Sequence, residues 1–153
     1  MRFSGAYSLH NGQAEWEKRD LSDWLTDLFE VPSIPIGLGC TGKIRQHIAN
    51  ELEAGGWSHN VRIDPNYDLT VTGRYRDLAF QIQTGNISRA IYDLMKLQYL
   101  YQQGKIEAAA LAVPTKAAGL MIASNVASVE RVWGEVQLFD RIITFPLLIV
   151  GFE

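Results

Sequence analysis

The apolar stretch from Glu107 to Val113 constrains the fold of this 153-residue chain more than any other. After Glu107 it reads AAALAV, with no polar position that would face water, and Pro114 ends it. A strand without polar alternation is typical of the middle of a sheet that is covered on both faces. A second apolar run, from Ile142 to Phe152, predicts another buried strand. The pattern therefore predicts an α/β fold, a mixed central β-sheet flanked by helices on both faces.

Helical segments surround these strands. Asn86 is expected to cap the helix after the polar hairpin described below, and Thr41 to cap an earlier one. Apolar residues at helical spacing and turn-forming residues at the ends predict helices over Glu15–Phe29, Gly42–Ala54, Ile87–Gln103 and Val126–Phe139.

Length, charge and cysteine content limit the class of protein. The length fits a single domain spanning residues 1–153, with an N-terminal arm and helix over about 1–39 and a core over about 40–153. A net charge of −3 argues against broad attraction to nucleic acid but is compatible with a local basic patch. Cys40 is the only cysteine, so we expect no internal disulfide and a cytoplasmic location. No apolar run is long enough to span a membrane.

The stretch from Asp68 to Asn86 predicts a β-hairpin. We place a two-residue turn at Arg74-Tyr75, which pairs Gly73 with Arg76. Apolar residues then face one another on one side of the hairpin, and polar residues on the other. A slip of one residue would mix the two sets, so the pattern supports this register.

The polar side of the hairpin gathers one carboxylate and two carboxamides. Asp68 faces Gln81 in the predicted register, and Gln83 lies diagonal to Asp68. Asp64 shares the same side and is the alternative acidic residue. Such a face is either a solvated sheet surface, which antiparallel sheets commonly have, or a functional cluster.

The segment QIQTGN, which runs from Gln81 to Asn86 and precedes a helix, resembles the Glu-x-Gln core of the BglII and BstYI group of type II restriction endonucleases. This group belongs to the PD-(D/E)XK nuclease superfamily. Its members carry an Asp on one hairpin strand, Glu-x-Gln on the next, and then a short loop with Asn. The Asp and Glu hold Mg²⁺, and the Gln stands where most superfamily members have Lys. The resemblance covers the chain from about residue 55 onward and implies a restriction-endonuclease-like core.

The resemblance implies a catalytic set of Asp68, Gln81 and Gln83. Asp68 would be the metal aspartate, and Gln83 would occupy the lysine position. Glu51 on the preceding helix and the backbone carbonyl of Ile82 would complete the Mg²⁺ site, although an ordinary surface glutamate is the more common interpretation of a residue such as Glu51. Gln81 stands where the group has its metal-binding Glu, and a carboxamide brings one oxygen but no charge to a hard cation.

The resemblance also implies double-stranded DNA as partner and a homodimer in which each subunit cuts one strand. Arg89 and Lys96 lie on the helix that follows the catalytic strand, where they would contact phosphate or simply solvate one face of the helix. Ser124 and Asn125 would bond base edges, or Asn125 would only cap the next helix. The candidate DNA-binding residues are Asn86, Arg89, Lys96, Lys116, Ser124, Asn125 and Arg131.

Three functions are compatible with these features. The first is Mg²⁺-dependent hydrolysis of DNA phosphodiesters, in which the metal polarises the phosphate and lowers the pKa of a bound water. The second is a catalytically inactive nuclease fold that acts in DNA binding or as an assembly module. The neutral Gln81 and the net negative charge of the chain favour this second function. The third is a protein-interaction domain without a role at nucleic acid.

Overall fold

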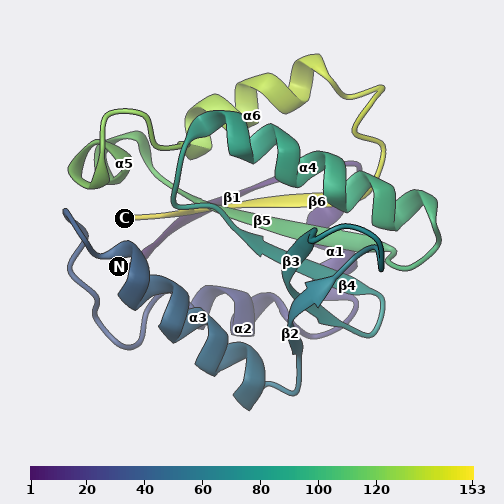
Figure 1. Ribbon diagram of the computed structural model, residues 1–153, viewed down its shortest axis with the longest axis horizontal. Coiled ribbons are helices and arrows are strands. Elements are labelled where there is room, and N and C mark those ends of the chain that lie inside the picture. Colours follow the sequence, from purple (N-terminus) through teal and green to yellow (C-terminus); the bar gives the residue numbers. More distant parts are fainter.

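A six-stranded mixed sheet forms the centre of the computed structural model, which describes residues 1–153 (Figure 1). Its strand order is β1-β6-β5-β4-β3-β2. Strands β4, β5 and β6 are parallel to one another, whereas β1, β3 and β2 pair antiparallel with their neighbours. The strands are β1 Phe3–Leu9, β2 Ser58–Arg62, β3 Thr70–Tyr75, β4 Leu78–Ile82, β5 Ala108–Pro114 and β6 Leu147–Phe152.

Helices cover both faces of this sheet, as predicted. Three of them lie on one side and two on the other, while α5 lies near one end of the sheet (Figure 1). The helices are α1 Gly12–Glu17, α2 Ser22–Asp27, α3 Thr41–Ala54, α4 Ile87–Gln102, α5 Lys116–Ile122 and α6 Val129–Leu138. None of them is both long enough and apolar enough to cross a lipid bilayer.

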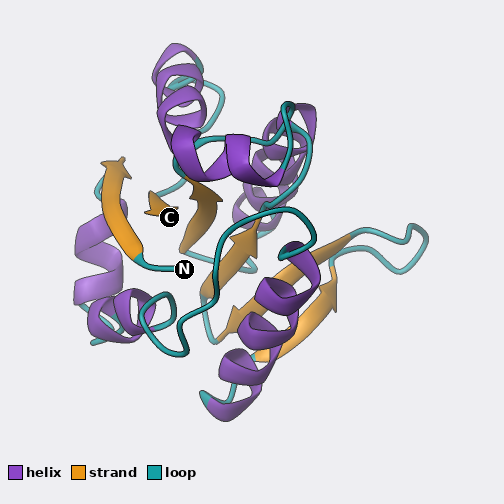
Figure 2. Ribbon diagram, turned by 90° about the vertical axis from the view of Figure 1, so that its left-hand side faces the viewer, coloured by secondary structure: helices purple, strands orange, loops and turns teal.

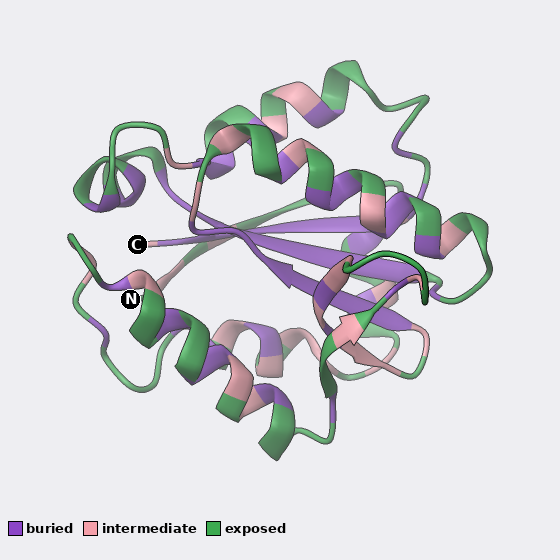
Figure 3. Cartoon of the chain, viewed as in Figure 1, coloured by how far each residue is buried: buried purple, intermediate pink, exposed green.

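The sheet separates two hydrophobic clusters, one of 21 and one of 19 buried residues. Alternate residues of β4 enter different clusters: Phe80 packs on the side of α1–α3, and Ala79 on the side of α4 and α6. Strands β4, β5 and β6 are buried along their whole length, while the helices turn a buried stripe inward (Figure 3). The apolar runs in the sequence therefore correspond to strands covered on both faces.

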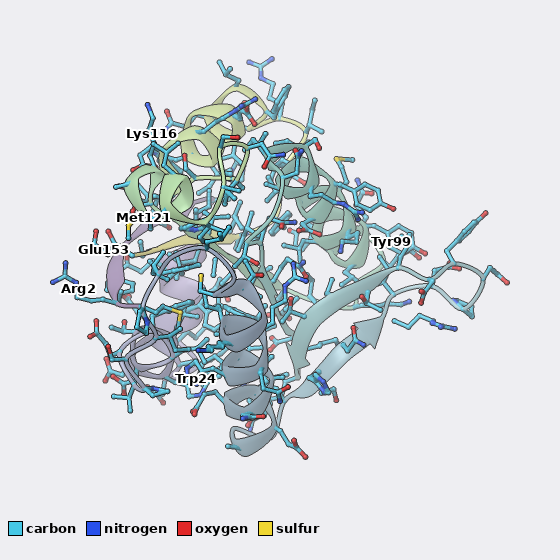
Figure 4. All side chains as sticks on the ribbon, turned by 60° about the vertical axis from the view of Figure 1, so that its left-hand side comes forward. Arg2, Trp24, Tyr99, Lys116, Met121 and Glu153 are labelled. Carbon is cyan, nitrogen blue, oxygen red and sulfur yellow. The ribbon has the colours of Figure 1, made fainter.

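The N-terminal arm belongs to the same sheet as the core. Strand β1 pairs with β6 from Phe3 to Leu9. The side chains of Arg2 and Glu153 form an ion pair beside this edge, where they lie next to each other in Figure 4.

The single helix predicted over Glu15–Phe29 is wrong, because the chain forms α1 and α2 instead. Between them Asp20 adopts a left-handed conformation with φ 55°, which a short polar side chain tolerates better than most. Trp16 and Leu25 are buried nonetheless, so the apolar pattern identified the inward side chains but not the break. Helix α5 was not predicted; the Thr115 hydroxyl caps it by accepting the Ala118 N–H at 3.2 Å.

The predicted register of the hairpin is also wrong. Gly73 pairs with Phe80, whereas the prediction paired Phe80 with a residue four positions earlier. The turn consequently lies at Arg76-Asp77, where Arg76 has a φ of 52°. Asp77 accepts a hydrogen bond of 3.0 Å from Nε of Arg19, which is 58 residues away in the sequence. A long-range ion pair thus holds a turn that local turn propensities do not favour.

Candidate nucleic-acid binding cleft

A polar cleft of about 620 Å³ opens at the carboxyl end of β4. The ladder between β3 and β4 extends only from Tyr75 to Gly73, and beyond this point the two strands separate. Residues of α3 form one wall and those of α4 another, while β2, β3, the end of β4 and the loop between β4 and α4 contribute the rest. Gly73 lets α3 approach β3 closely, since a Cβ there would lie 2.8 Å from Cδ2 of Leu52. Ligands of open α/β sheets commonly bind in such a crevice at the carboxyl ends of parallel strands.

The charged residues that line the cleft are mainly cationic. Arg45 comes from α3 and Arg89 from the first turn of α4, and neither forms an ion pair. The third cation, Lys96, is paired with the one carboxylate of the cleft, Asp93. A chain with a net charge of −3 therefore carries a local excess of positive charge in this cleft.

Thr72 and Gln81 form the floor of the cleft at the point where the strands separate. The Thr72 N–H donates to Oε1 of Gln81 at 2.9 Å, and the Thr72 hydroxyl donates to the same oxygen at 3.2 Å. The hydroxyl oxygen in turn accepts the N–H of Ile82 at 3.1 Å. Side chains thus bridge β3 and β4 where the backbone ladder has stopped. Thr72, which was not predicted as a site residue, holds the position opposite Gln81 that was predicted for Asp68.

A buried network lies beside this floor. Nε2 of Gln83 donates to Oδ2 of Asp93 at 2.7 Å, and Nζ of Lys96 lies 2.7 Å from Oδ1 of the same carboxylate. Oε1 of Gln83 accepts the N–H of Gly85 at 2.7 Å. Nζ of Lys96 also donates to the carbonyl oxygen of Thr70 at 2.6 Å. Asp93 was not predicted as a site residue, although its spacing of three residues from Lys96 on a helix is the signal of such a pair.

Asp68 does not join Gln81 and Gln83, so the predicted cluster of these three residues is wrong. It lies in the loop between β2 and β3, which projects away from the sheet (Figure 2). Its side chain is 90% exposed and contacts Arg62 at 3.3 Å, and it does not line the cleft. The shift in register by four residues is the cause. Asp64, the alternative, accepts the N–H of Asn66 at 2.8 Å within the same loop.

Glu51 also lies outside the cleft, contrary to its predicted place at a metal site. Arg45 and Ala49 are the residues of α3 that line the cleft. Glu51 is two residues beyond Ala49 and so points to a different side of the helix. It lies 3.9 Å from Nδ1 of His47, and 44% of its side chain is exposed. Ile82, the third predicted metal ligand, does line the cleft.

The predicted DNA-binding residues divide between two neighbouring surfaces. Asn86, Arg89 and Lys96 line the cleft, and Oδ1 of Asn86 caps α4 by accepting the N–H of Ser88 at 2.9 Å. A bridge between Asn86 and Val126 brings the loop after α5 beside the cleft. A second groove, of about 420 Å³ between α5 and α6, is lined by Lys116, Ser124 and Arg131, and Asn125 lies in the adjoining loop.

The residues of the cleft do not fit a Mg²⁺ ion. Mg²⁺ is usually bound through one or two carboxylates. The facing positions on β3 and β4 are Thr72 and Gln81, which carry no charge, and both carboxylate oxygens of Asp93 are already engaged. Nowhere in the structure do three His, Cys, Asp or Glu side chains come together as a metal site.

The carboxyl groups with shifted pKa values belong to an ion cluster outside the cleft. Hydrogen bonds from Arg19 lower the pKa of Asp77 and that of Glu15. The same guanidinium lies 2.8 Å from Oε2 of Glu107. The cluster connects α1, the β3–β4 turn and the start of β5. Its role is to hold the hairpin against α1.

Comparison with known proteins identifies the fold and the family. The structure superposes on a crystal structure of restriction endonuclease BglII complexed with a DNA 16-mer, with a TM-score of 0.81 and 12% sequence identity, covering 100% of this chain and 78% of that one. It also superposes on a crystal structure of free BglII, with a TM-score of 0.69 and 16% identity, covering 100% of this chain and 80% of that one. No curated protein sequence matches significantly.

The family model described as restriction endonuclease BglII/BglIII matches residues 4–152. This match spans nearly the whole chain, including the N-terminal strand that the sequence resemblance left out. The predicted restriction-endonuclease-like fold is thereby confirmed. The chain belongs to the BglII/BglIII family of restriction endonucleases.

Proposed function

We propose that this protein binds double-stranded DNA in the cleft at the carboxyl end of β4. The observation that carries the proposal is the pair of arginines, Arg45 and Arg89, which stand without ion-pair partners on two different walls of a polar cleft. Guanidinium groups recognise phosphate bidentately, and phosphate contacts supply most of the affinity of DNA-binding proteins. Support also comes from the relative, since BglII was crystallised with DNA. Such a role agrees with a cytoplasmic location.

We further propose that the cleft does not hydrolyse DNA with Mg²⁺. Thr72 and Gln81 occupy the two facing positions where the family pattern requires carboxylates, and both are neutral. Without that charge the site lacks the ligands that would hold a cation against phosphate. The second candidate function, Mg²⁺-dependent endonuclease activity, is favoured by membership of the family. Incubation of supercoiled plasmid with Mg²⁺ or Mn²⁺ distinguishes the two.

We propose that the protein acts as a homodimer joined through the outer face of α4. Tyr92, Met95 and Tyr99 recur at helical spacing on this face and are at least a third exposed. Phe139 and Ile142, at the end of α6 and beyond it, extend the apolar surface on one side, where Met95 shares a small groove with them. Exposed apolar surface of this kind marks interaction sites, and a two-fold dimer would pair the same patch on both subunits.

The DNA-binding proposal is tested by fluorescence anisotropy with a short labelled duplex. Replacement of both Arg45 and Arg89 by Ala should weaken binding about tenfold or more and make the salt dependence less steep, because each phosphate contact contributes to the slope. Lys43→Ala is the matched control, since Lys43 lies exposed on α3 but outside the cleft. Equal losses in the control and in the arginine variant would contradict a binding site in this cleft.

A further inference from the structure

We propose that the floor of the cleft is a binding site for a phosphate oxygen of DNA, and that the phosphate binds there without a divalent cation. The carboxamide of Gln81 and the ammonium group of Lys96 supply the hydrogen-bond donors. This inference rests on the proposed function and deepens it, since it assigns the chemistry of the ligand at one end of the cleft. In the family pattern this end carries acceptors for a cation, and here it carries donors for an anion.

The orientation of the Gln81 carboxamide follows from its partner. The backbone N–H of Thr72 can only donate, so the atom that faces it must be the carbonyl oxygen of Gln81. The amide nitrogen is then the other arm, and it has no hydrogen-bond partner within the chain. Gln81 is only 7% exposed, yet its amide nitrogen still reaches solvent. The fully buried polar atoms that lack a hydrogen-bond partner belong to other residues. A nearly buried donor at the surface of a cleft calls for an acceptor from a ligand.

Lys96 provides a second donor that is fixed in place. Two of its three N–H groups are directed at Asp93 and at the carbonyl oxygen of Thr70, which leaves one free. Its side chain is 11% exposed and lines the same cleft as Gln81. The ammonium group is therefore held in position before any ligand arrives, which lowers the entropic cost of binding.

The acceptors near the floor are already occupied. Oε1 of Gln81 accepts from Thr72, and Oε1 of Gln83 accepts from Gly85. The two carboxylate oxygens of Asp93 are engaged by Gln83 and Lys96. A cation would find no vacant carboxylate at this floor, whereas an anionic oxygen would find two donors. This excess of free donors over free acceptors favours an anionic phosphate oxygen over a cation.

The test is Gln81→Glu, measured by anisotropy with a short labelled duplex in EDTA. The new carboxylate keeps the oxygen that Thr72 bonds but replaces the free amide donor with a negative charge. We expect the affinity to fall about 10- to 100-fold, as for loss of a hydrogen bond to a charged group, and Mg²⁺ not to restore it. Gln102→Glu adds the same charge on an exposed residue of α4 outside the cleft and should leave the affinity within about twofold. Circular dichroism establishes that both variants are folded.

Two results would overturn the inference. One is an affinity of Gln81→Glu equal to that of the unaltered protein in EDTA. The other is DNA binding by the unaltered protein that requires Mg²⁺ at matched ionic strength, since a donor floor needs no cation. In both cases DNA binding itself survives, so the proposed function stands and only the assignment of the floor fails. If the unaltered protein binds no duplex at all, both fail.

Discussion

Introducing carboxylates at both floor positions, 72 and 81, should create a cation site and make stability depend on the bound cation. In the double variant Thr72→Asp, Gln81→Glu, two acidic side chains replace atoms that now lie 3.2 Å apart, the hydroxyl oxygen of Thr72 and Oε1 of Gln81. The hydroxyl proton that joins these two oxygens is lost. Two carboxylates at this separation cannot both ionise easily, so the pKa of one of them should rise.

The expected loss of folding stability follows from the distance between these two oxygens. Two unit charges 3.2 Å apart repel by about 5 kcal/mol at an effective dielectric constant of about 20 and by about 1 kcal/mol in bulk water. Because the floor is open to the cleft, we expect the double variant to lose about 1–5 kcal/mol of stability near neutral pH in EDTA. A divalent cation that binds only the folded state would offset about 2.7 kcal/mol at a hundredfold excess over its Kd.

The assay is urea denaturation in EDTA and in Mn²⁺, followed by circular dichroism. The control variant Thr72→Asn, Gln81→Glu has nearly the same shape but one fewer charge, so it should respond less to Mn²⁺. A double variant as stable in EDTA as the unaltered protein, and unaffected by Mn²⁺, would refute the reasoning. Such a result would mean that the side chains at positions 72 and 81 do not face each other.

Two further predictions concern parts of the molecule outside the cleft. Arg19→Met should lower stability by about 1 kcal/mol at neutral pH, discounted for the partial exposure of its carboxylate partners. Because Arg19 lowers the pKa of Asp77 in the folded state, this contribution is fully present above the ordinary value of 3.8 and fades as the pH falls from there through the lower pKa of the folded state, so the two proteins should converge in acid denaturation curves. Met95→Glu places a charge on the apolar face of α4 and should convert a dimer into a monomer in light scattering after gel filtration; an unchanged mass would place the interface elsewhere.

The central strands and the main helices were predictable from the sequence because their signals are local. The unbroken apolar stretches specify β5 and β6, and Asn86 followed by a long amphipathic segment specifies α4. The break between α1 and α2 was not predictable, because a single left-handed residue, Asp20, redirects a stretch whose apolar spacing remains helical.

The site was predicted in part, for a reason that lies in the geometry of strands. The error in register was four residues, an even number, so Gln81 and Gln83 kept their side of the hairpin although their partners changed. The predicted apolar side did not stay together, because Val71 and Phe80 belong to different hydrophobic clusters. Gln81 and Gln83 therefore line the cleft as expected, while Asp68 is displaced and Thr72 takes its place. Arg45 was not predicted as a site residue, because no sequence pattern shows that α3 forms a wall of the cleft.

The central claim, that this member of a nuclease family holds DNA in a cleft without metal-dependent cleavage, is tested most directly with one preparation and two readouts. Labelled duplex is titrated in EDTA, and supercoiled plasmid is incubated with Mg²⁺ or Mn²⁺ at protein concentrations that saturate binding. We predict a bound duplex and an intact plasmid. Nicking or linearisation that depends on the cation and disappears in Gln81→Ala would contradict the account.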